Sequence, residues 1–385
     1  MAALFGFLDP GTQAWMLLDE VRTRAYAEAI ARTVKPGDVV VDVGSGSGIL
    51  ALLAARAGAR RVYAIEMTAM ASLIDEHARQ NGLEEVVRVV RARAEELSGA
   101  VIDEPPTVVV SETLGHFAPD EHVHRLMRAV RTVCAPEVTW IPRTYRMRFA
   151  LARIDALDRE LARLEGGLDV RLGALARRLR SRPTVAKVGP DELLGPERAS
   201  APIPVHAPQP SSYREPLVVE RDGEANAIVA SFEAELTDGV RLSTGVDAPA
   251  TCWRQTVFPL DAPLPVRAGD RVEAEVRPRL VTDRGTWVWR VSRGEEARGG
   301  DAMEALVGGS AAEIAQELGL RLHRSPPVRL GRKLRAWRAI LGAELEGATV
   351  ETLAAHLRAQ RPDDFADDED ARQEVMALLR AADAA

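Results

Sequence analysis

The sequence predicts an α/β domain with a parallel sheet in about its first 145 residues, followed by a β-rich part and a helical C-terminal part. First, apolar runs at 39–41 and 61–65 flank a glycine-rich turn and an alanine-rich stretch, which is a β-α-β pattern. Second, strand-like and helix-like segments keep alternating up to residue 133. Third, the alternation stops after Pro142. We therefore expect helices on both faces of a parallel sheet, and a different architecture beyond it.

The elements of the α/β domain follow one another in a clear order. Residues 15–33 read as one amphipathic helix, because apolar residues recur on one face until Pro36 and Gly37 end it. The further expected segments are strand 39–41, helix 49–57, strand 61–65, helix 69–80, strand 86–90, strand 107–110 and helix 121–133.

The chain beyond Pro142 falls into two further parts. Residues 155–182 are rich in regularly spaced leucines interrupted by Gly166 and Gly167, which is typical of a helical hairpin or arm. A proline-rich connector at 202–210 precedes short strand-like segments at 216–220, 226–235, 253–259, 271–276 and 286–291, which favour a β-sandwich or barrel. From about residue 299 the chain reads as helical. We expect domains at 1–145, 146–298 and 299–385.

Composition excludes several classes of protein. The net charge of −7 gives no reason to expect nucleic acid as a partner. Cys134 and Cys252 are the only cysteines and lie far apart, so neither a disulfide framework nor a zinc site is expected. The N-terminus lacks the pattern of a secretory signal, and no apolar run is long enough for a membrane helix. We expect a cytoplasmic protein without a bound metal.

A glycine-rich turn points to a nucleotide-like ligand. The run DVGSGSG at 42–48 lies where the first strand meets its helix, so its glycines let the backbone turn tightly and approach a ligand. Dinucleotide-binding proteins need a third glycine or alanine where this chain has Ile49, so the spacing disfavours NAD. Glu66 ends the second strand, at the distance where an acid accepts hydrogen bonds from ribose hydroxyls. The alternative is an ordinary turn and a solvated strand end.

With these motifs the chain resembles the protein arginine methyltransferase family. The resemblance covers most of residues 12–295 and rests on four stretches, MLLDEVRT at 16–23, VDVGSGSGIL at 41–50, SETLGHFAPDE at 111–121 and TCWRQTVF at 251–258. It implies a Rossmann-like S-adenosyl-L-methionine-binding domain followed by a β-barrel, with an inserted helical arm that docks on a second subunit. Residues 155–200 are placed like that arm. The resemblance therefore implies a head-to-tail homodimer.

The resemblance also implies a set of site residues. It places Arg22 against the cofactor carboxylate, Asp42 and Gly44 beside the methionine moiety, Glu66 on the ribose and Glu95 near the adenine amine. The same set of cofactor-binding residues includes Gly46, Met67 and Ala94, and the residues implied for the substrate are Asp19 and Trp253. Glu112 and Glu121 become the catalytic acidic pair that holds the substrate guanidinium.

The acidic pair suits guanidinium chemistry. A guanidinium is always charged and presents five donors in a rigid fork, so two carboxylates can orient it and draw positive charge toward the nitrogens that they contact. The remaining nitrogen then becomes the nucleophile. Other interpretations remain open: Glu121 as a helix-start acid, Glu112 as a loop carboxylate, and Asp19 with Arg22 as a surface ion pair.

The sequence departs from the family at several positions. It has FGFL at 5–8 in place of a tyrosine-bearing segment, Gln13 in place of a histidine, and Thr113 and Leu114 between the two glutamates. Cys252 replaces the histidine of the Thr-His-Trp motif, and it cannot supply an imidazolium to Asp19. His116, in the acceptor loop, is a candidate substitute base, although a solvated loop histidine is the alternative.

Three functions follow from these observations. The first is methylation of an arginine guanidinium in a protein or peptide. The second is methylation of a small amine, guanidine or natural product, and the third is a cofactor-binding scaffold without turnover. The last 85 residues lie outside the resemblance and suit a small helical or winged-helix-like unit, which either caps the barrel or recruits a substrate.

Overall fold

The computed structural model describes residues 9–167, 172–280 and 285–302, together with residues 355 and 372. All but the last two belong to a compact unit that spans residues 2–306. Most of the expected C-terminal unit at 299–385, and the FGFL segment at 5–8, lie outside the described residues.

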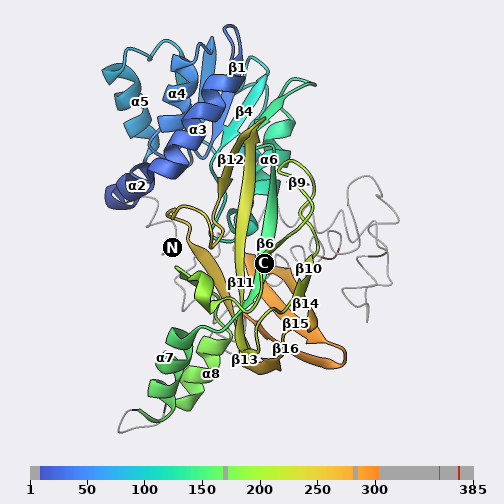
Figure 1. Cartoon of the computed structure of the whole chain (residues 1–385). Coiled ribbons are helices and arrows are strands. Elements are labelled where there is room, and N and C mark those ends of the chain that lie inside the picture. Colours follow the sequence, from blue (N-terminus) through green and yellow to red (C-terminus); the bar gives the residue numbers. More distant parts are fainter. Residues whose placement is uncertain (1–8, 168–171, 281–284, 303–354, 356–371, 373–385) are drawn as a thin grey trace, which may run out of the picture. The chain divides into compact units, whose positions relative to one another are not determined.

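A five-stranded parallel sheet forms the first half of this unit (Figure 1), as the alternating pattern predicted. Its strand order is β3-β2-β1-β4-β5. The strands are β1 (Val39–Val43), β2 (Arg61–Ile65), β3 (Val87–Val90), β4 (Val108–Ser111) and β5 (Thr139–Ile141). Every residue of β1 and β4 is buried, which explains why their sequences are continuous valine-rich runs and not alternating ones. The central pair brings Asp42 opposite Val110 in register.

The helices of this domain are α2 (Pro10–Leu17), α3 (Glu20–Thr33), α4 (Ile49–Arg56), α5 (Ala71–Gln80) and α6 (Val123–Arg131). The prediction of one helix over 15–33 is wrong, because the helix is interrupted at Leu18 and Asp19, between α2 and α3. The side chain of Asp19 accepts a hydrogen bond from the backbone N–H of Arg22 and so caps the start of α3. Asp19 is therefore the N-terminal cap of α3 and not a residue in the middle of a surface helix.

Two antiparallel sheets form the second half. A seven-stranded sheet contains the path β7-β13-β11-β6-β8, with β12 paired to β11 and β9 to β6, and a four-stranded sheet has the order β10-β14-β15-β16. The strands are β6 (Thr144–Ala152), β7 (Thr184–Ala186), β8 (Arg198–Ala199), β9 (Ile203–Pro204), β10 (Tyr213–Val218), β11 (Gly223–Thr237), β12 (Val240–Ser243), β13 (Gln255–Val266), β14 (Arg271–Leu280), β15 (Gly285–Arg293) and β16 (Glu296–Asp301).

Strand β16 corrects the expectation that the chain is helical from about residue 299. Gly299 and Gly300 belong to this strand and lie against Trp289 of β15. A Cβ atom on Gly299 would come within 2.1 Å of the Trp289 carbonyl oxygen, and one on Gly300 within 2.4 Å of the Trp289 ring. The two glycines therefore mark a close strand-to-strand approach and not a helix boundary.

The leucine-rich segment forms a pair of helices, α7 (Asp155–Gly166) and α8 (Gly173–Arg180), as the sequence predicted. They lie between β6 and β7 in the chain, and Figure 1 shows them side by side. Leu161 and Ala176 are the buried residues of the two helices.

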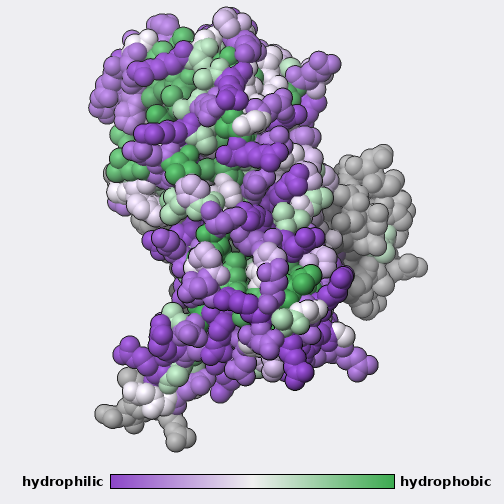
Figure 2. Space-filling view, in the orientation of Figure 1, coloured by the Kyte–Doolittle hydropathy of each residue, from purple (hydrophilic) through white to green (hydrophobic). Residues whose placement is uncertain are grey.

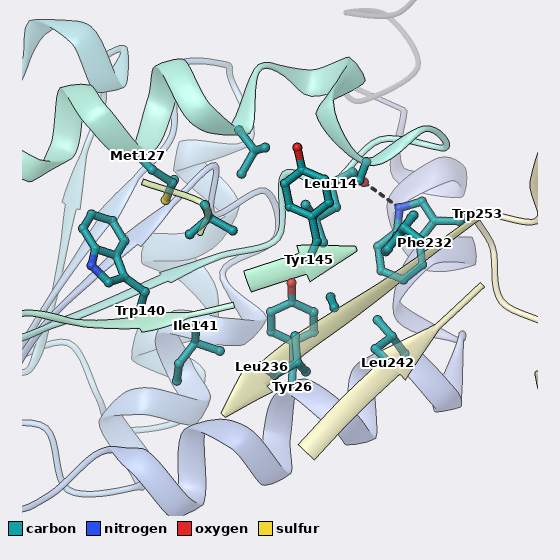
Figure 3. Packing of buried hydrophobic residues seen from close by; sticks show 14 of the residues in the cluster. Tyr26, Leu114, Met127, Trp140, Ile141, Tyr145, Phe232, Leu236, Leu242 and Trp253 are labelled. Atoms are coloured by element: carbon teal, nitrogen blue, oxygen red, sulfur yellow. Dashed lines mark hydrogen bonds between the residues drawn. The ribbon is translucent and has the colours of Figure 1, made fainter. Parts of the chain in front are cut away.

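The two halves share a hydrophobic core where α3 packs against β11 and β12. Tyr26 of α3 is buried there, and its hydroxyl donates to the backbone carbonyl of Ser111 at 3.1 Å. Figure 3 shows Tyr26 in the same cluster as Tyr145, Phe232 and Trp253 from the antiparallel part. On the face drawn in Figure 2, hydrophobic residues gather over the α/β domain, whereas the rest of the described surface is mostly hydrophilic. No helix among the described residues combines the length and apolar character needed to cross a membrane.

Candidate active site

The glycine-rich turn leaves its backbone open at the end of β1. Gly44 and Gly46 have φ values of +74° and +53°, in the left-handed region that favours glycine. A Cβ atom on Gly44 would lie 2.9 Å from Cγ2 of Thr113, and one on Gly46 would lie 3.0 Å from Oε1 of Gln13. The turn therefore needs glycine both for its conformation and for its close neighbours.

Asp42 presents an unsatisfied oxygen at this turn. It is fully buried, and its Oδ2 accepts a hydrogen bond from the backbone N–H of Ala51 at 3.1 Å. Its Oδ1 is one of the few buried side-chain oxygens in the described part of the chain without a hydrogen-bond partner. Burial raises the pKa of Asp42 to about 7. A buried acceptor without a donor costs free energy, so this oxygen fits a ligand that brings a donor.

Glu66 joins the ends of β1 and β2. Its Oε2 accepts from the N–H of Gly46 at 2.9 Å, and its Oε1 accepts from the N–H of Thr68 at 2.8 Å. A carboxylate offers about four acceptor positions, so both oxygens keep capacity for two hydroxyl groups of a ribose. Together with the orphaned Asp42 oxygen and the glycine turn, Glu66 fits the S-adenosylmethionine that the sequence implies.

The other expected cofactor residues lie at the neighbouring strand ends. Met67 follows Glu66 and is 43% exposed. Ala94 is buried in a short 3-10 helix after β3, and Glu95 next to it forms an ion pair with Arg125 at 3.0 Å. An adenine amine would therefore share the Glu95 carboxylate with this arginine.

The loop after β4 carries both glutamates of the expected acidic pair. Gly115 closes the loop, since its N–H donates to the carbonyl of Ala118 at 3.1 Å. A Cβ atom on Gly115 would lie 2.5 Å from Cβ of Asp120 and 3.4 Å from Cγ of Glu121. The closed loop thus places Glu112 and Glu121 in one acidic site, although they are separated by eight residues in the sequence.

The electrostatics of the two glutamates differ from those of surface acids. Burial raises the pKa of Glu112 to about 7, and Arg22, which forms an ion pair with it, opposes this rise. Burial also raises the pKa of Glu121 to about 8, assisted by the negative charges of Glu112 and Asp120. The single positive charge of Arg22 therefore only partly offsets the burial and the like charges that raise both pKa values.

Asp19 and Trp253 connect this loop to the second half of the molecule. Asp19 Oδ2 accepts the backbone N–H of Cys252 at 2.6 Å, while its Oδ1 caps α3. Trp253 donates its indole N–H to the carbonyl of Leu114 at 2.6 Å, the dashed line in Figure 3. The guanidinium of Arg22 lies 5.7 Å from the centre of the Trp253 ring, which is within cation–π range. Asp19 and Arg22 are thus partners in the site and not a surface ion pair.

Asp120 is a site residue that the sequence analysis did not single out. Its Oδ1 accepts the indole N–H of Trp287 at 2.5 Å, and its Oδ2 accepts the N–H of Phe117 at 3.2 Å. Burial raises its pKa to about 7. Its position directly before Glu121 could have indicated a place in the site. The sequence gives no indication of its partner Trp287 on β15. In the described residues, no cluster of side chains suits a metal ion.

Comparisons with known proteins identify families and relatives that this chain resembles. Residues 21–134 match the family model for ribosomal protein L11 methyltransferase (PrmA), and residues 168–284 match that for the arginine methyltransferase oligomerization subdomain. An arginine N(omega)-methyltransferase of Streptomyces achromogenes subsp. streptozoticus is 32% identical, over 66% of this chain and 72% of that protein. The protein arginine N-methyltransferase PRMT10 of Oryza sativa subsp. japonica is 30% identical, over 68% of this chain and 78% of that protein.

Solved structures show the same fold. The Trypanosoma brucei PRMT1 enzyme-prozyme heterotetrameric complex with AdoHcy has a TM-score of 0.70 at 24% identity, covering 77% of this chain and 98% of that chain. Arabidopsis thaliana protein arginine methyltransferase 10 has a TM-score of 0.65 at 22% identity, covering 77% of this chain and 99% of that chain. From the sequence relatives, the chain belongs to the protein arginine methyltransferase family and is a class I S-adenosylmethionine-dependent methyltransferase.

Proposed function

We propose that this protein transfers a methyl group from S-adenosylmethionine to a guanidinium nitrogen of arginine in a protein or peptide. The single observation that carries the proposal is the half-buried pair Glu112 and Glu121 on one closed loop, beside the glycine turn that follows β1. A guanidinium is the cation that two such carboxylates hold best, because its planar fork donates to both.

The charge of the site supports a cationic acceptor. Arg22 compensates part of the charge on Glu112, whereas Glu121 feels the like charges of Glu112 and Asp120. A bound guanidinium would stabilise both glutamates in their charged form and lower their pKa values. The same contacts would localise positive charge on two nitrogens and leave the third with the most available lone pair.

Each residue has a defined part in this reaction. S-adenosylmethionine supplies the electrophilic methyl group when it is bound. Asp42 and Glu66 accept hydrogen bonds on the cofactor side, and Glu112 and Glu121 hold the acceptor. Trp253 covers the loop through its hydrogen bond to Leu114 and keeps it closed. Most of the acceleration would come from orientation and electrostatics, since no covalent intermediate with the protein is needed.

A small guanidine is the second candidate acceptor. The Streptomyces relative is named arginine N(omega)-methyltransferase, without mention of a protein substrate. The same acidic pair would hold free arginine equally well. A scaffold without turnover is the weaker alternative, because Arg22, Glu66, Glu112 and Glu121 are all present and engaged in one site.

We further propose that the antiparallel sheets form the family's β-barrel and that α7 and α8 are an arm that docks head-to-tail on a second copy. Exposed apolar side chains support this assembly. Leu172 and Leu175 are 37% and 46% exposed at the arm. Trp15 and Leu18 are 49% and 77% exposed at the N-terminal helices, where a partner's arm would find an apolar surface.

We also propose domain boundaries near residues 145 and 298, with the second moved to the end of β16 at Asp301, and a cytoplasmic location. The first boundary is supported by strand pairing, since β5 pairs with β4 of the parallel sheet and β6 pairs with β11 of the antiparallel sheet. The two free cysteines are compatible with a reducing compartment.

The experiment is methyl transfer from labelled S-adenosylmethionine to an Arg-rich peptide pool and, separately, to free L-arginine, with analysis of acid hydrolysates for methylarginine. Glu112→Gln tests the acidic pair. Glu104→Gln is the matched control, because Glu104 pairs with Arg60 outside the site. We expect label in methylarginine that Glu112→Gln abolishes and Glu104→Gln retains. Cofactor binding without label in either acceptor would refute the proposal, and label in free arginine alone would select the second candidate.

A further inference from the structure

Methylation of a guanidinium releases a proton, and the family's usual imidazole is absent from the segment at 251–253. Cys252 stands at that position, and burial raises the pKa of its thiol to about 12. A thiol that stays neutral is neither a cation partner for Asp19 nor an acceptor of protons at physiological pH. The proton must therefore go to another group.

His116, in the loop after β4, brings an imidazole to the same segment. Its Nδ1 lies 2.7 Å from the backbone carbonyl oxygen of Trp253, the residue directly after Cys252. A carbonyl only accepts hydrogen bonds, so Nδ1 must carry the proton and donate. In the neutral ring this contact fixes the tautomer in which Nε2 is unprotonated and basic. Nε2 has no partner among the described residues.

His116 belongs to the same loop as the acidic pair and lies between Glu112 and Glu121 in the sequence. It directly follows Gly115, whose missing Cβ would lie 3.4 Å from Cγ of Glu121. On its other side is Trp253, which also contacts Leu114 and lies near the Arg22 guanidinium. The imidazole and the acidic pair thus belong to one loop, and Trp253 hydrogen-bonds to this loop at both His116 and Leu114.

The other two acids of the site accept hydrogen bonds from the protein itself. Asp19 accepts the N–H groups of Arg22 and Cys252, one on each oxygen. Asp120 accepts the N–H groups of Phe117 and Trp287, again one on each oxygen. These contacts hold the loop and the neighbouring segments in place, and protonation of either carboxylate would weaken them.

Glu112 and Glu121 have a different task. In the proposed function they must stay ionised to hold a cation and to direct charge away from its third nitrogen. A carboxylate that took the proton would lose that hold within the same step. A neutral base next to the pair avoids this conflict, because it can be protonated without releasing the guanidinium.

We infer that His116 is the base that accepts the proton released by the guanidinium, in place of the imidazole that the sequence lacks at Cys252. The acceptor nitrogen forms a bond to the methyl carbon as the carbon–sulfur bond breaks and its electron pair stays on sulfur. The proton of that nitrogen passes to Nε2, and the imidazolium then releases it to solvent. Substrate and product guanidinium groups both carry one positive charge, so one proton leaves per methyl transferred. This inference rests on the proposed function.

The test is the pH profile of kcat for His116→Asn with the acceptor that the wild-type protein methylates, either the peptide pool or free L-arginine. The asparagine amide nitrogen replaces Nδ1 and keeps the hydrogen bond to Trp253, but no basic nitrogen remains. We expect kcat to fall by about 10²-fold near neutral pH, as is usual for loss of a general base. KM and the melting temperature should stay near the wild-type values, and the pH profile of kcat should change, because only the ionisation of the two glutamates then remains in it.

A second variant guards against a structural loss. His116→Ala opens space for free imidazole, and added imidazole should restore a measurable part of kcat. An unchanged pH profile in His116→Asn, or an inactive His116→Ala that imidazole does not rescue, would overturn the inference while leaving methyl transfer by the wild-type protein intact. If the wild-type protein methylates neither acceptor, the proposed function fails and this inference fails with it.

Discussion

Arg22 of α3 and Glu112 of the loop after β4 form an ion pair inside the candidate active site, with side-chain exposures of 9% and 15%. The resemblance assigned the arginine to the cofactor and the glutamate to the substrate. In the proposed function, their direct contact would let one positive charge act on both the cofactor side and the acceptor side. Neither residue can then be changed without effect on the other.

The first prediction is a double-mutant cycle on this pair. Arg22→Met leaves a buried carboxylate without its partner, which costs about 3–5 kcal/mol in comparable cases. Adding Glu112→Gln removes the stranded charge, so the double variant should recover much of that stability without recovering activity. Urea unfolding at pH 8.5 measures the cycle. Equal stabilities for the single and double variants would show that the ion pair does not compensate the charge of Glu112.

The second prediction concerns the glycine turn. Gly44→Ala combines a left-handed φ with a contact of 2.9 Å to the Thr113 methyl group, whereas Gly37→Ala has a similar φ of +97° but open space around it. We expect both to lose stability, but Gly44→Ala alone to weaken binding of S-adenosylhomocysteine by tenfold or more in calorimetry. Thr113→Ser in the Gly44→Ala background removes the methyl group and should regain part of the affinity. Equal affinities for the two alanine variants would contradict a role of this turn in cofactor binding.

The sequence predicted most clearly those elements that are determined by residues close together in the chain, namely the buried strands and the glycine-rich turn. Buried parallel strands read as apolar runs because both faces are covered, and the DVGSGSG turn with Glu66 stands at the ends of two of them. It misread 15–33 because the apolar spacing continues through Asp19, whose capping role depends on the hydrogen bond to Arg22. It missed the contact between Asp120 and Trp287, since 167 residues separate the two. Periodicity does not report such long-range partners.

The third prediction tests the proposed arm. Leu175→Asp places a charge on an apolar surface that we expect to be buried against a second copy, so it should convert a dimer to a monomer. Val218→Asp is the control, because Val218 is 39% exposed on β10, away from the helices. Light scattering at micromolar protein measures both. A wild-type protein that is already monomeric would refute the proposed dimer, and an intact dimer in Leu175→Asp would place its interface elsewhere.

The fourth prediction is an unusual pH dependence of stability in the protein without ligands. Burial raises the pKa values of Glu112 and Glu121 from the ordinary 4.5 to about 7 and about 8. At pH values between the ordinary pKa and the raised pKa, the folded protein binds more protons than the unfolded chain. The free energy of unfolding must therefore fall as the pH rises through this range. Each pKa unit corresponds to about 1.4 kcal/mol. The melting temperature should therefore drop between pH 5 and pH 8, contrary to the behaviour of acids held in ion pairs.

Glu121→Gln should reduce this slope, because a neutral amide does not ionise when the pH rises, while Asp42 and Asp120, whose pKa values burial also raises to about 7, retain part of it. Glu104→Gln is the control and should leave the slope unchanged, because Glu104 pairs with Arg60 near the surface and lies outside the candidate site. Differential scanning calorimetry across pH 5 to 8 measures all three proteins. A guanidinium ligand should also flatten the slope, because it stabilises the charged form of the same two glutamates. A melting temperature that rises with pH in the wild-type protein would show that positive charges of the protein itself already compensate Glu112 and Glu121. The electrostatic argument for a cationic acceptor would then fail.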